Sequence, residues 1–340
     1  MEDQGRSIAV WHKPTTQNSD KARAELHVNF WHFKTGFWNF LPCIGEKYDG
    51  FLDIGLMLYD LDKLGNINIS IPVKLEPSDI VDLGAQFREA SIATAIFNEN
   101  LAQSHDSIND CADLNLGESL FARVCWLTES DFTKVSKYIE YQDGRTILQI
   151  PKSIVEERNL NWPAITVKEN RLYFRFRFKL RRDKNSPFMQ RFRPWDRLIT
   201  SSHDLVEYLD FRFNRIRNLP KNIRKEIFSN SFMFEKINFF IISSIENDVV
   251  NGYKTFDKIR ILEEDVWSKY LDKKIETNMV IYQWKEDKTK EDLSAFVKFR
   301  TRKTGILTYL IFVVFLAFLT ELYKNFGNIL SSLIQLLTGR

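Results

Sequence analysis

Cysteine is scarce in this sequence, and that scarcity excludes two common ways of stabilising a fold. The chain has only Cys43, Cys111 and Cys125, and no two of them form a CxxC pair. An odd number of cysteines at these spacings argues against a disulfide framework and against a structural zinc site. Three reduced thiols in an intracellular domain are the simpler expectation.

Recognisable catalytic motifs are also missing. The sequence has no Gly-Lys-Ser/Thr phosphate loop, no GxGxxG and no HExxH, and its first residues lack the apolar segment of a secretory signal. His105, Asp106 and Asp110 cluster in a polar stretch, but their spacing is not diagnostic of a metal or acid/base site. We therefore assign no catalytic residue, metal or cofactor from the sequence, and an enzyme is the less favoured interpretation.

Apolar and charged residues are both plentiful. Hydrophobic residues make up 44% of the 340 positions and charged residues 27%, which excludes a disordered, collagen-like or polytopic membrane chain. The 28 phenylalanines predict a substantial core, because large aromatic side chains bury much area per residue.

Alternating apolar and polar residues predict β-strands along much of the chain. The clearest strand covers Arg171–Arg182, where apolar residues from Leu172 to Leu180 share one face and Tyr173, Arg175, Arg177, Lys179 and Arg181 share the other. Further expected elements are a β-hairpin from residues 51–61 and 67–73, a helix from Ser202 to about Asn218, strands over 232–245 and 279–284, and a helix over 264–271. The predicted fold class is α+β, with a mostly antiparallel mixed sheet followed by a single C-terminal transmembrane helix.

Positive charge is concentrated in one segment. Residues 1–170 have 16 basic and 25 acidic side chains, whereas residues 171–225 have 16 basic and 5 acidic ones. Arginine's planar fork suits phosphate and carboxylate groups. The candidate ligand-binding residues are Arg175, Arg177, Lys179, Arg181, Arg191, Arg193 and Arg197. They are expected to meet an anionic nucleotide, a nucleic acid, acidic lipid headgroups or an acidic protein; alternatively, they pair with the acidic excess of residues 1–170 or form a solvated face.

The C-terminal part contains the longest uncharged run. Residues 304–320 hold no charged side chain, and a helix of this length extends about 25 Å, near the lower limit for crossing a bilayer. This predicts a transmembrane helix over 304–323. Its lipid-facing residues are Leu307, Leu310, Phe312, Phe315 and Leu319. The basic residues just before the run place residues 1–303 in the cytoplasm of a single-pass membrane protein.

The apolar positions near the C-terminus also follow a 4-3-4-3 spacing, from Phe312 through Phe315, Leu319, Leu322 and Phe326 to Leu336. Such a repeat indicates a helix that packs against copies of itself or lies in a membrane interface. The expected organisation is a leader over 1–20, two parts of one cytosolic domain over 21–170 and 171–303, the transmembrane helix, and an amphipathic tail over 324–340.

These features favour one functional hypothesis over two others. The favoured one is a tail-anchored protein whose cytosolic domain senses an anionic ligand or partner and acts through self-association of its C-terminal helix, as a microbial defence or stress effector would. The alternatives are a membrane-anchored enzyme that cleaves lipid or nucleic-acid phosphodiesters and a passive scaffold.

Overall fold

The structure is a computed structural model, and it places most of the chain. The residues that it describes are 5–14, 21–33, 48–103, 110–127, 135–160, 162, 169–181, 186–192, 204–252, 255–271, 278–286, 290–302, 310 and 313–327. Within them the chain is mixed α+β, with three β-sheets and short helices.

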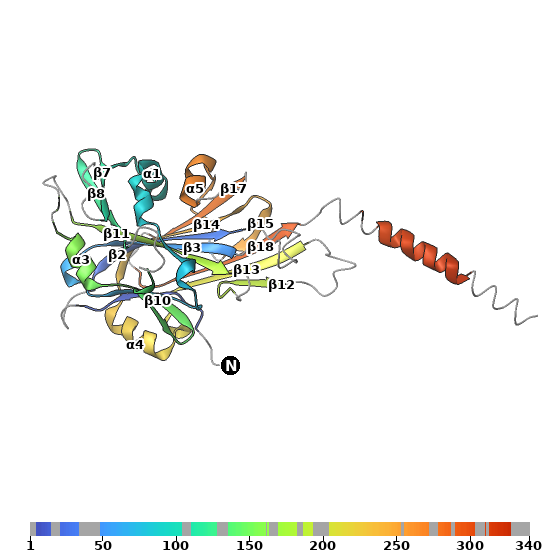
Figure 1. Ribbon diagram of the computed structural model, residues 1–340, viewed down its shortest axis with the longest axis horizontal. Helices are drawn as coiled ribbons and strands as arrows, with labels where there is room; N and C mark the ends of the chain where they lie inside the picture. Colours follow the sequence, from blue (N-terminus) through green and yellow to red (C-terminus); the bar gives the residue numbers. More distant parts are fainter. Residues whose placement is uncertain are drawn as a thin grey trace, which may run out of the picture.

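A ten-stranded sheet forms the middle of the molecule (Figure 1). Its strands follow the order β16-β17-β14-β2-β3-β11-β8-β7-β6, and β5 also pairs with β11. The pairs β2–β14 and β8–β11 are parallel, and the other pairs are antiparallel. The strands are β2 (Arg23–His32), β3 (Tyr48–Leu58), β5 (Ile80–Asp82), β6 (Ala102–Gln103), β7 (Cys111–Leu116), β8 (Ser119–Cys125), β11 (Leu172–Arg181), β14 (Met233–Ser244), β16 (Lys258–Ile261) and β17 (Met279–Glu286).

Two four-stranded sheets complete the β-structure. One has the order β1-β4-β10-β9 and the other β12-β13-β18-β15. Asn214, which has a left-handed backbone (φ 49°), joins them, because its side chain accepts from the Val10 N–H at 2.8 Å and donates to the Val10 carbonyl at 3.1 Å. The strands are β1 (Ala9–His12), β4 (Ile67–Ile71), β9 (Ile139–Gln142), β10 (Arg145–Ile150), β12 (Met189–Phe192), β13 (Asp204–Phe213), β15 (Asn247–Gly252) and β18 (Leu293–Arg302).

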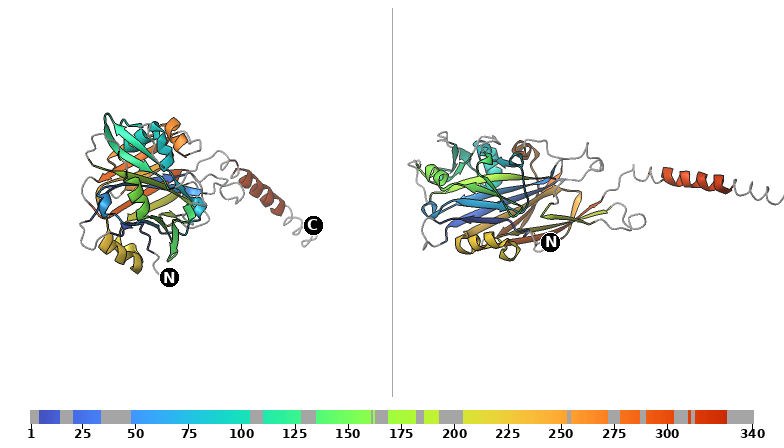
Figure 2. Two further views of the ribbon diagram at one scale, coloured as in Figure 1. Left: turned by 60° about the vertical axis from the view of Figure 1, so that its left-hand side comes forward. Right: turned by 60° about the horizontal axis from the view of Figure 1, so that its bottom comes forward.

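The main core lies between the large sheet and the two smaller ones. Figures 1 and 2 show the smaller sheets together on one face of the large sheet. Apolar side chains of β11 such as Phe174, Phe176 and Phe178 meet those of β4 and β13 there, including Ile69 and Phe211. Each fully buried phenylalanine stabilises the fold by about 1.5–3 kcal/mol. This core explains the high phenylalanine content.

Helices cover the remaining faces. On the opposite face of the large sheet, α1 and α5 pack over two smaller apolar clusters (Figure 1). On the outside of β1 and β10, α4 contributes Ile223 and Ile227 to a fourth cluster. The large sheet is therefore covered on both faces. The α-helices are α1 (Ala90–Phe97), α3 (Lys152–Arg158), α4 (Lys221–Asn230) and α5 (Glu264–Leu271), and short 3-10 turns cover Leu61–Lys63, Pro77–Asp79, Gly84–Arg88 and Ile216–Asn218.

Two of the expected elements are wrong. The apolar runs 51–61 and 67–73 do not pair as a hairpin: β3 lies in the large sheet, while β4 pairs with β1 and β10. Residues 204–213 form strand β13 and not a helix, because Leu209, Phe211 and Phe213 alternate into the main core. Apolar residues four apart fit either structure, and the pairing with β18 decides in favour of the strand.

The expected transmembrane helix is also wrong. Within the described residues, no helix combines the length and the apolar character needed to cross a membrane. The C-terminal helix is described over residues 313–327 and includes Glu321 and Lys324, whereas the expectation rested on an uncharged run that begins at residue 304. This finding contradicts the span over 304–323 and the single-pass location with residues 1–303 in the cytoplasm. Leu310, Phe315 and Leu319 are exposed in the structure, and Leu307 and Phe312 lie outside the described residues.

Candidate functional site

The arginines of strand β11 lie inside the molecule. Arg175 and Arg177 point to the face of the large sheet that α5 covers, and their exposed fractions are 0% and 4%. The alternation expected from the sequence is present, but the polar face is buried at Tyr173, Arg175 and Arg177 and becomes half-buried only at Lys179 and Arg181. Arg175 and Arg177 are therefore not presented to a ligand at the surface.

Asp53 of β3 is the anion at the centre of this buried cluster. Its two oxygens accept from Nε and Nη2 of Arg177 at 2.7 and 2.9 Å. They also accept from the Trp31 indole N–H at 2.9 Å and from the Tyr270 hydroxyl at 2.8 Å. Burial alone would raise the pKa of Asp53, but the charge and hydrogen bonds of Arg177 outweigh it and lower that pKa.

Arg175 completes the cluster without a carboxylate of its own. Its Nε donates to the Tyr270 hydroxyl at 2.6 Å and its Nη1 to the Tyr173 hydroxyl at 2.8 Å. The Tyr173 ring lies directly over Gly55, where a Cβ atom would come within 2.1 Å of the hydroxyl oxygen. A glycine is needed at this point of β3 so that Tyr173 can reach Arg175.

The other predicted ligand residues also have protein partners where the structure describes them. Arg181 pairs with Asp79 at 2.7 Å and contacts Glu76. Lys179 is half-buried, with its ammonium 5.8 Å from the centre of the Tyr48 ring. Acidic residues of the first 170 positions therefore neutralise part of the positive charge of the basic segment. Arg193 and Arg197 lie outside the described residues, so a ligand site that includes them stays a prediction.

A second buried network surrounds Glu207 of β13. Its carboxylate contacts Nε2 of His32 at 3.0 Å and accepts from Nε of Arg191 at 2.8 Å, while Arg191 also pairs with Asp49 at 2.9 Å. The other ring nitrogen of His32 lies 3.1 Å from the Ser243 hydroxyl. A serine, a histidine and a glutamate in this order resemble a nucleophilic triad. However, Ser243, His32 and Glu207 are at most 1% exposed, so a substrate cannot reach the hydroxyl.

The described acidic residues near Cys111 are paired with arginines. Asp110 pairs with Arg158 at 3.1 Å, and Asp113 pairs with Arg123 at 2.7 Å. Among the placed residues, no three His, Cys, Asp or Glu side chains gather closely enough to hold a metal ion. His105 and Asp106 lie outside the described residues.

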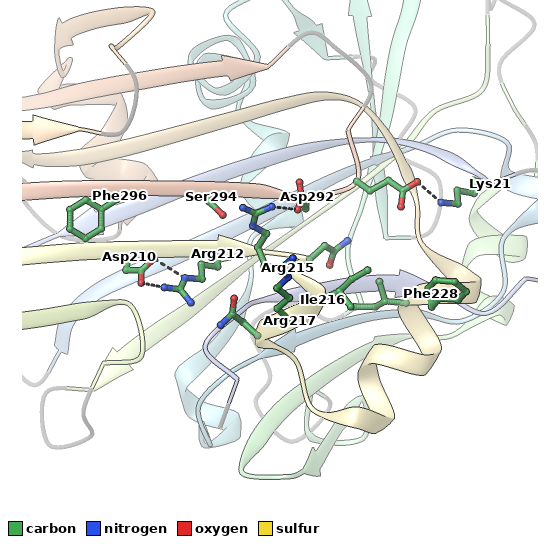
Figure 3. Close-up of a pocket in the computed structure, with 14 residues that line it drawn as sticks. Lys21, Asp210, Arg212, Arg215, Ile216, Arg217, Phe228, Asp292, Ser294 and Phe296 are labelled. Carbon is green, nitrogen blue, oxygen red and sulfur yellow. Dashed lines mark hydrogen bonds and ion pairs between the residues drawn. The ribbon is translucent and has the colours of Figure 1, made fainter. Parts of the chain in front are cut away.

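A groove of about 1040 Å³ lies on the outer face of β13 and β18, bordered by α4. We call it the β13–α4 groove; Figure 3 shows the residues that line it. Asp210 and Arg212 lie there because their neighbours along β13 alternate into the main core. The lining residues are Lys21, Asp210, Arg212, Asn214, Arg215, Ile216, Arg217, Asn218, Ile227, Phe228, Glu291, Asp292, Ser294 and Phe296.

Most charges in this groove are paired. Arg212 binds Asp210 through two hydrogen bonds of 2.5 and 2.9 Å, Arg215 binds Asp292 at 2.6 Å, and Lys21 binds Glu291 (Figure 3). Arg217 is exposed and forms no side-chain ion pair within the described part of the chain. Among the described residues, the groove thus offers one unpaired guanidinium, on Arg217, and a second, on Arg215, whose exposed partner Asp292 can release it.

Apolar side chains accompany these charges. Phe228 of α4 is 79% exposed, and Ile216 and Phe296 are about 40% exposed. Ile223 and Ile227 bury the inner face of α4, which leaves Phe228 on the polar face. Arg212, Arg215 and Arg217 belong to the basic segment over 171–225, whereas Phe228 lies just beyond it and has no charge to mark it. A phenylalanine on the outer face of an amphipathic helix is the signal that would have revealed it.

Removing the charge of Asp53 tests the role of the buried cluster. Asp53→Asn keeps the side-chain shape but leaves two buried guanidinium groups without an anion, so we expect the free energy of unfolding to fall by ~3–5 kcal/mol. Urea denaturation near neutral pH measures it. Asp292→Asn, which breaks an exposed pair with Arg215, should cost at most ~1 kcal/mol. Similar losses in the two variants would contradict a special role for Asp53.

The Glu207 network predicts how stability responds to acid. Burial alone would raise the pKa of Glu207, but His32 and Arg191 lower it from 4.5 to about 2. Because the folded pKa is the lower one, this carboxylate contributes stability above about pH 4.5, and the contribution, ~3 kcal/mol, is lost as the pH falls toward 2. Glu207→Gln should therefore flatten the acid side of the stability–pH curve, measured by urea denaturation. Exposed Glu156→Gln serves as the control and should leave the curve unchanged.

No protein-family model matches this chain, and no curated protein resembles its sequence at a significant level.

Proposed function

We propose that this chain is a binding protein whose β13–α4 groove recognises an acidic segment of another polypeptide. The observation that carries the proposal is Arg217, an exposed guanidinium that has no ion pair with any described residue, in the same groove as the exposed ring of Phe228. Arginine and aromatic residues are the side chains most enriched at the energetic centres of protein interfaces. A guanidinium also binds a carboxylate through two parallel hydrogen bonds.

The charge balance of the groove favours an acidic polypeptide over a nucleic acid. Four basic and three acidic side chains line it, which leaves one positive charge in excess. A nucleic-acid backbone carries a phosphate at every nucleotide and would face Asp210, Glu291 and Asp292 at close range. An acidic peptide has separate carboxylates, which can bind Arg215 and Arg217. Its apolar side chains can be placed away from the acidic residues of the groove.

The apolar residues give such a segment a place to anchor. Phe228 and Ile216 lie on the α4 side of the groove, and Phe296 lies on β18 (Figure 3). Covering exposed aromatic and aliphatic area contributes about 25 cal/mol per Å² of apolar surface. The partner segment therefore combines acidic residues with at least one large apolar side chain.

A charge reversal in the groove tests this proposal. The probe is a fluorescein-labelled peptide of alternating glutamate and leucine, and its binding to the full chain is followed by fluorescence anisotropy. Arg217→Glu should weaken binding about tenfold or more, which corresponds to ~1.4 kcal/mol. Phe228→Ser should also weaken it, because the apolar contact is lost.

The matched control is Lys225→Glu, which makes the same charge change on the exposed surface of α4 but outside the groove. It should change the affinity less than twofold. If it weakens binding as much as Arg217→Glu, attraction is a matter of net charge and the groove is not the site. If a single-stranded oligonucleotide binds the groove more tightly than the peptide, the partner is a nucleic acid and the proposal is wrong.

We also propose that the C-terminal helix over 313–327 associates with the same helix of a second copy. This helix stands apart from the three β-sheets in Figure 1, and its large apolar side chains are 44–83% exposed. Phe315, Leu319, Leu322 and Phe326 follow a 4-3-4 spacing, which places them on one stripe. A stripe of this spacing is complementary to itself, so a second copy is the partner that it fits best.

Sedimentation velocity at several protein concentrations tests the association. Leu319→Lys with Leu322→Lys should shift the chain to monomer, because two cations would enter the shared stripe. The control, Val314→Lys with Thr320→Lys, adds the same charge outside the stripe and should keep the assembly. A wild-type chain that is monomeric at every concentration would rule out association through this helix.

A further inference from the structure

A second, smaller cavity lies on the face of the large sheet opposite the main core. It has a volume of about 260 Å³ and lies between the C-terminal end of α1 and the strands β14, β17 and β16. No residue lines both this cavity and the β13–α4 groove. We call it the β16–α1 cavity. Its ligand would be independent of the partner proposed above.

Basic side chains dominate its lining. Lys236, Lys258, Arg260 and Lys285 contribute four positive charges, against two negative ones from Asp257 and Glu99. They come together because alternate residues of three adjacent strands point to the same face: Lys258 lies opposite Gln283, and Arg260 opposite Ile281. The lining of this cavity has two positive charges in excess, whereas that of the β13–α4 groove has one, and the cavity has about a quarter of the groove's volume. The cavity therefore favours an anion more strongly than the groove does.

An uncharged polar group adds specificity. Asn238 of β14 lines the cavity and is 7% exposed, and its side-chain oxygen is buried and accepts no hydrogen bond from the described residues. A buried carbonyl without a donor costs about 1–3 kcal/mol. A ligand hydroxyl group can supply that donor. Because Phe97 of α1 forms part of the wall, the ligand also meets an apolar surface there.

We propose that the β16–α1 cavity binds a small phosphorylated metabolite with at least one free hydroxyl group. Pockets for drug-sized ligands have volumes of roughly 300–1000 Å³. The β16–α1 cavity, at about 260 Å³, suits a smaller molecule such as a sugar phosphate. The phosphate contacts Lys258 and Lys285 on the strand side of the cavity. The neutral part lies toward α1, because Glu99 and the carbonyl end of that helix repel an anion. The ligand hydroxyl donates to Asn238.

Calorimetric titration of the full chain at constant ionic strength tests this site, with ribose 5-phosphate, inorganic phosphate and ribose as probes. Ribose 5-phosphate and phosphate should bind, and ribose alone should not. Lys258→Glu should weaken the binding of both phosphate compounds about tenfold. Asn238→Leu should weaken only ribose 5-phosphate, because inorganic phosphate does not need the hydroxyl contact.

Lys225→Glu and Arg217→Glu are the controls, and both should bind ribose 5-phosphate as the wild type does. A wild-type chain that binds neither phosphate compound at millimolar concentration overturns the proposal. Equal weakening by Lys225→Glu would show general attraction of anions, and loss in Arg217→Glu would place the anion in the β13–α4 groove. Either result contradicts a site at the β16–α1 cavity, whatever the outcome for the acidic peptide.

Discussion

The buried contact between Asp53 and Arg177 is the interaction on which the rest of the structure depends. It lies where β3 and β11 pair in the middle of the large sheet, and it is covered by Tyr270 of α5. A charge at this depth is tolerated only when its partner and its remaining hydrogen bonds are all present. The position of α5 and the register of two central strands are therefore both required by one carboxylate.

This constraint also determines which basic residues remain for binding. Arg175 and Arg177 neutralise and surround Asp53, while Arg181 and Arg191 pair with acidic residues of the first 170 positions. Part of the positive charge of the segment is therefore paired within the fold. Of its exposed arginines, Arg215 and Arg217 line the β13–α4 groove, where charges are nearly balanced and aromatic side chains lie beside them. Such a surface suits a polypeptide with separate carboxylates better than a continuous polyanion.

The alternation of apolar and polar residues predicted the strands better than it predicted what covers each face of a strand. The strand over 171–182 is confirmed as β11, and those over 232–245 and 279–284 as β14 and β17, because alternation is a property of the strand itself. Whether the polar face of β11 meets water depends on Tyr270, 93 residues beyond Arg177, and no local pattern contains that information. The groove was likewise hidden, because β13, β18 and α4 meet only in the fold. The β16–α1 cavity combines residues from four separate elements, none of them in the basic segment.

The strand order has a consequence for how the chain reaches this state. Asp53 lies 124 residues from Arg177 and 217 from Tyr270 along the sequence, so its partners arrive only after long loops have closed. Topologies dominated by such distant pairings fold slowly, typically in milliseconds to seconds or longer. During synthesis from the N-terminus, the segment with Asp53 is complete before β11 and α5 exist. Until β11 and α5 have been synthesised, the negative excess of residues 1–170 is not balanced by the basic segment, and the outer edges of β2 and β3 are unpaired. The centre of the large sheet cannot be completed before then.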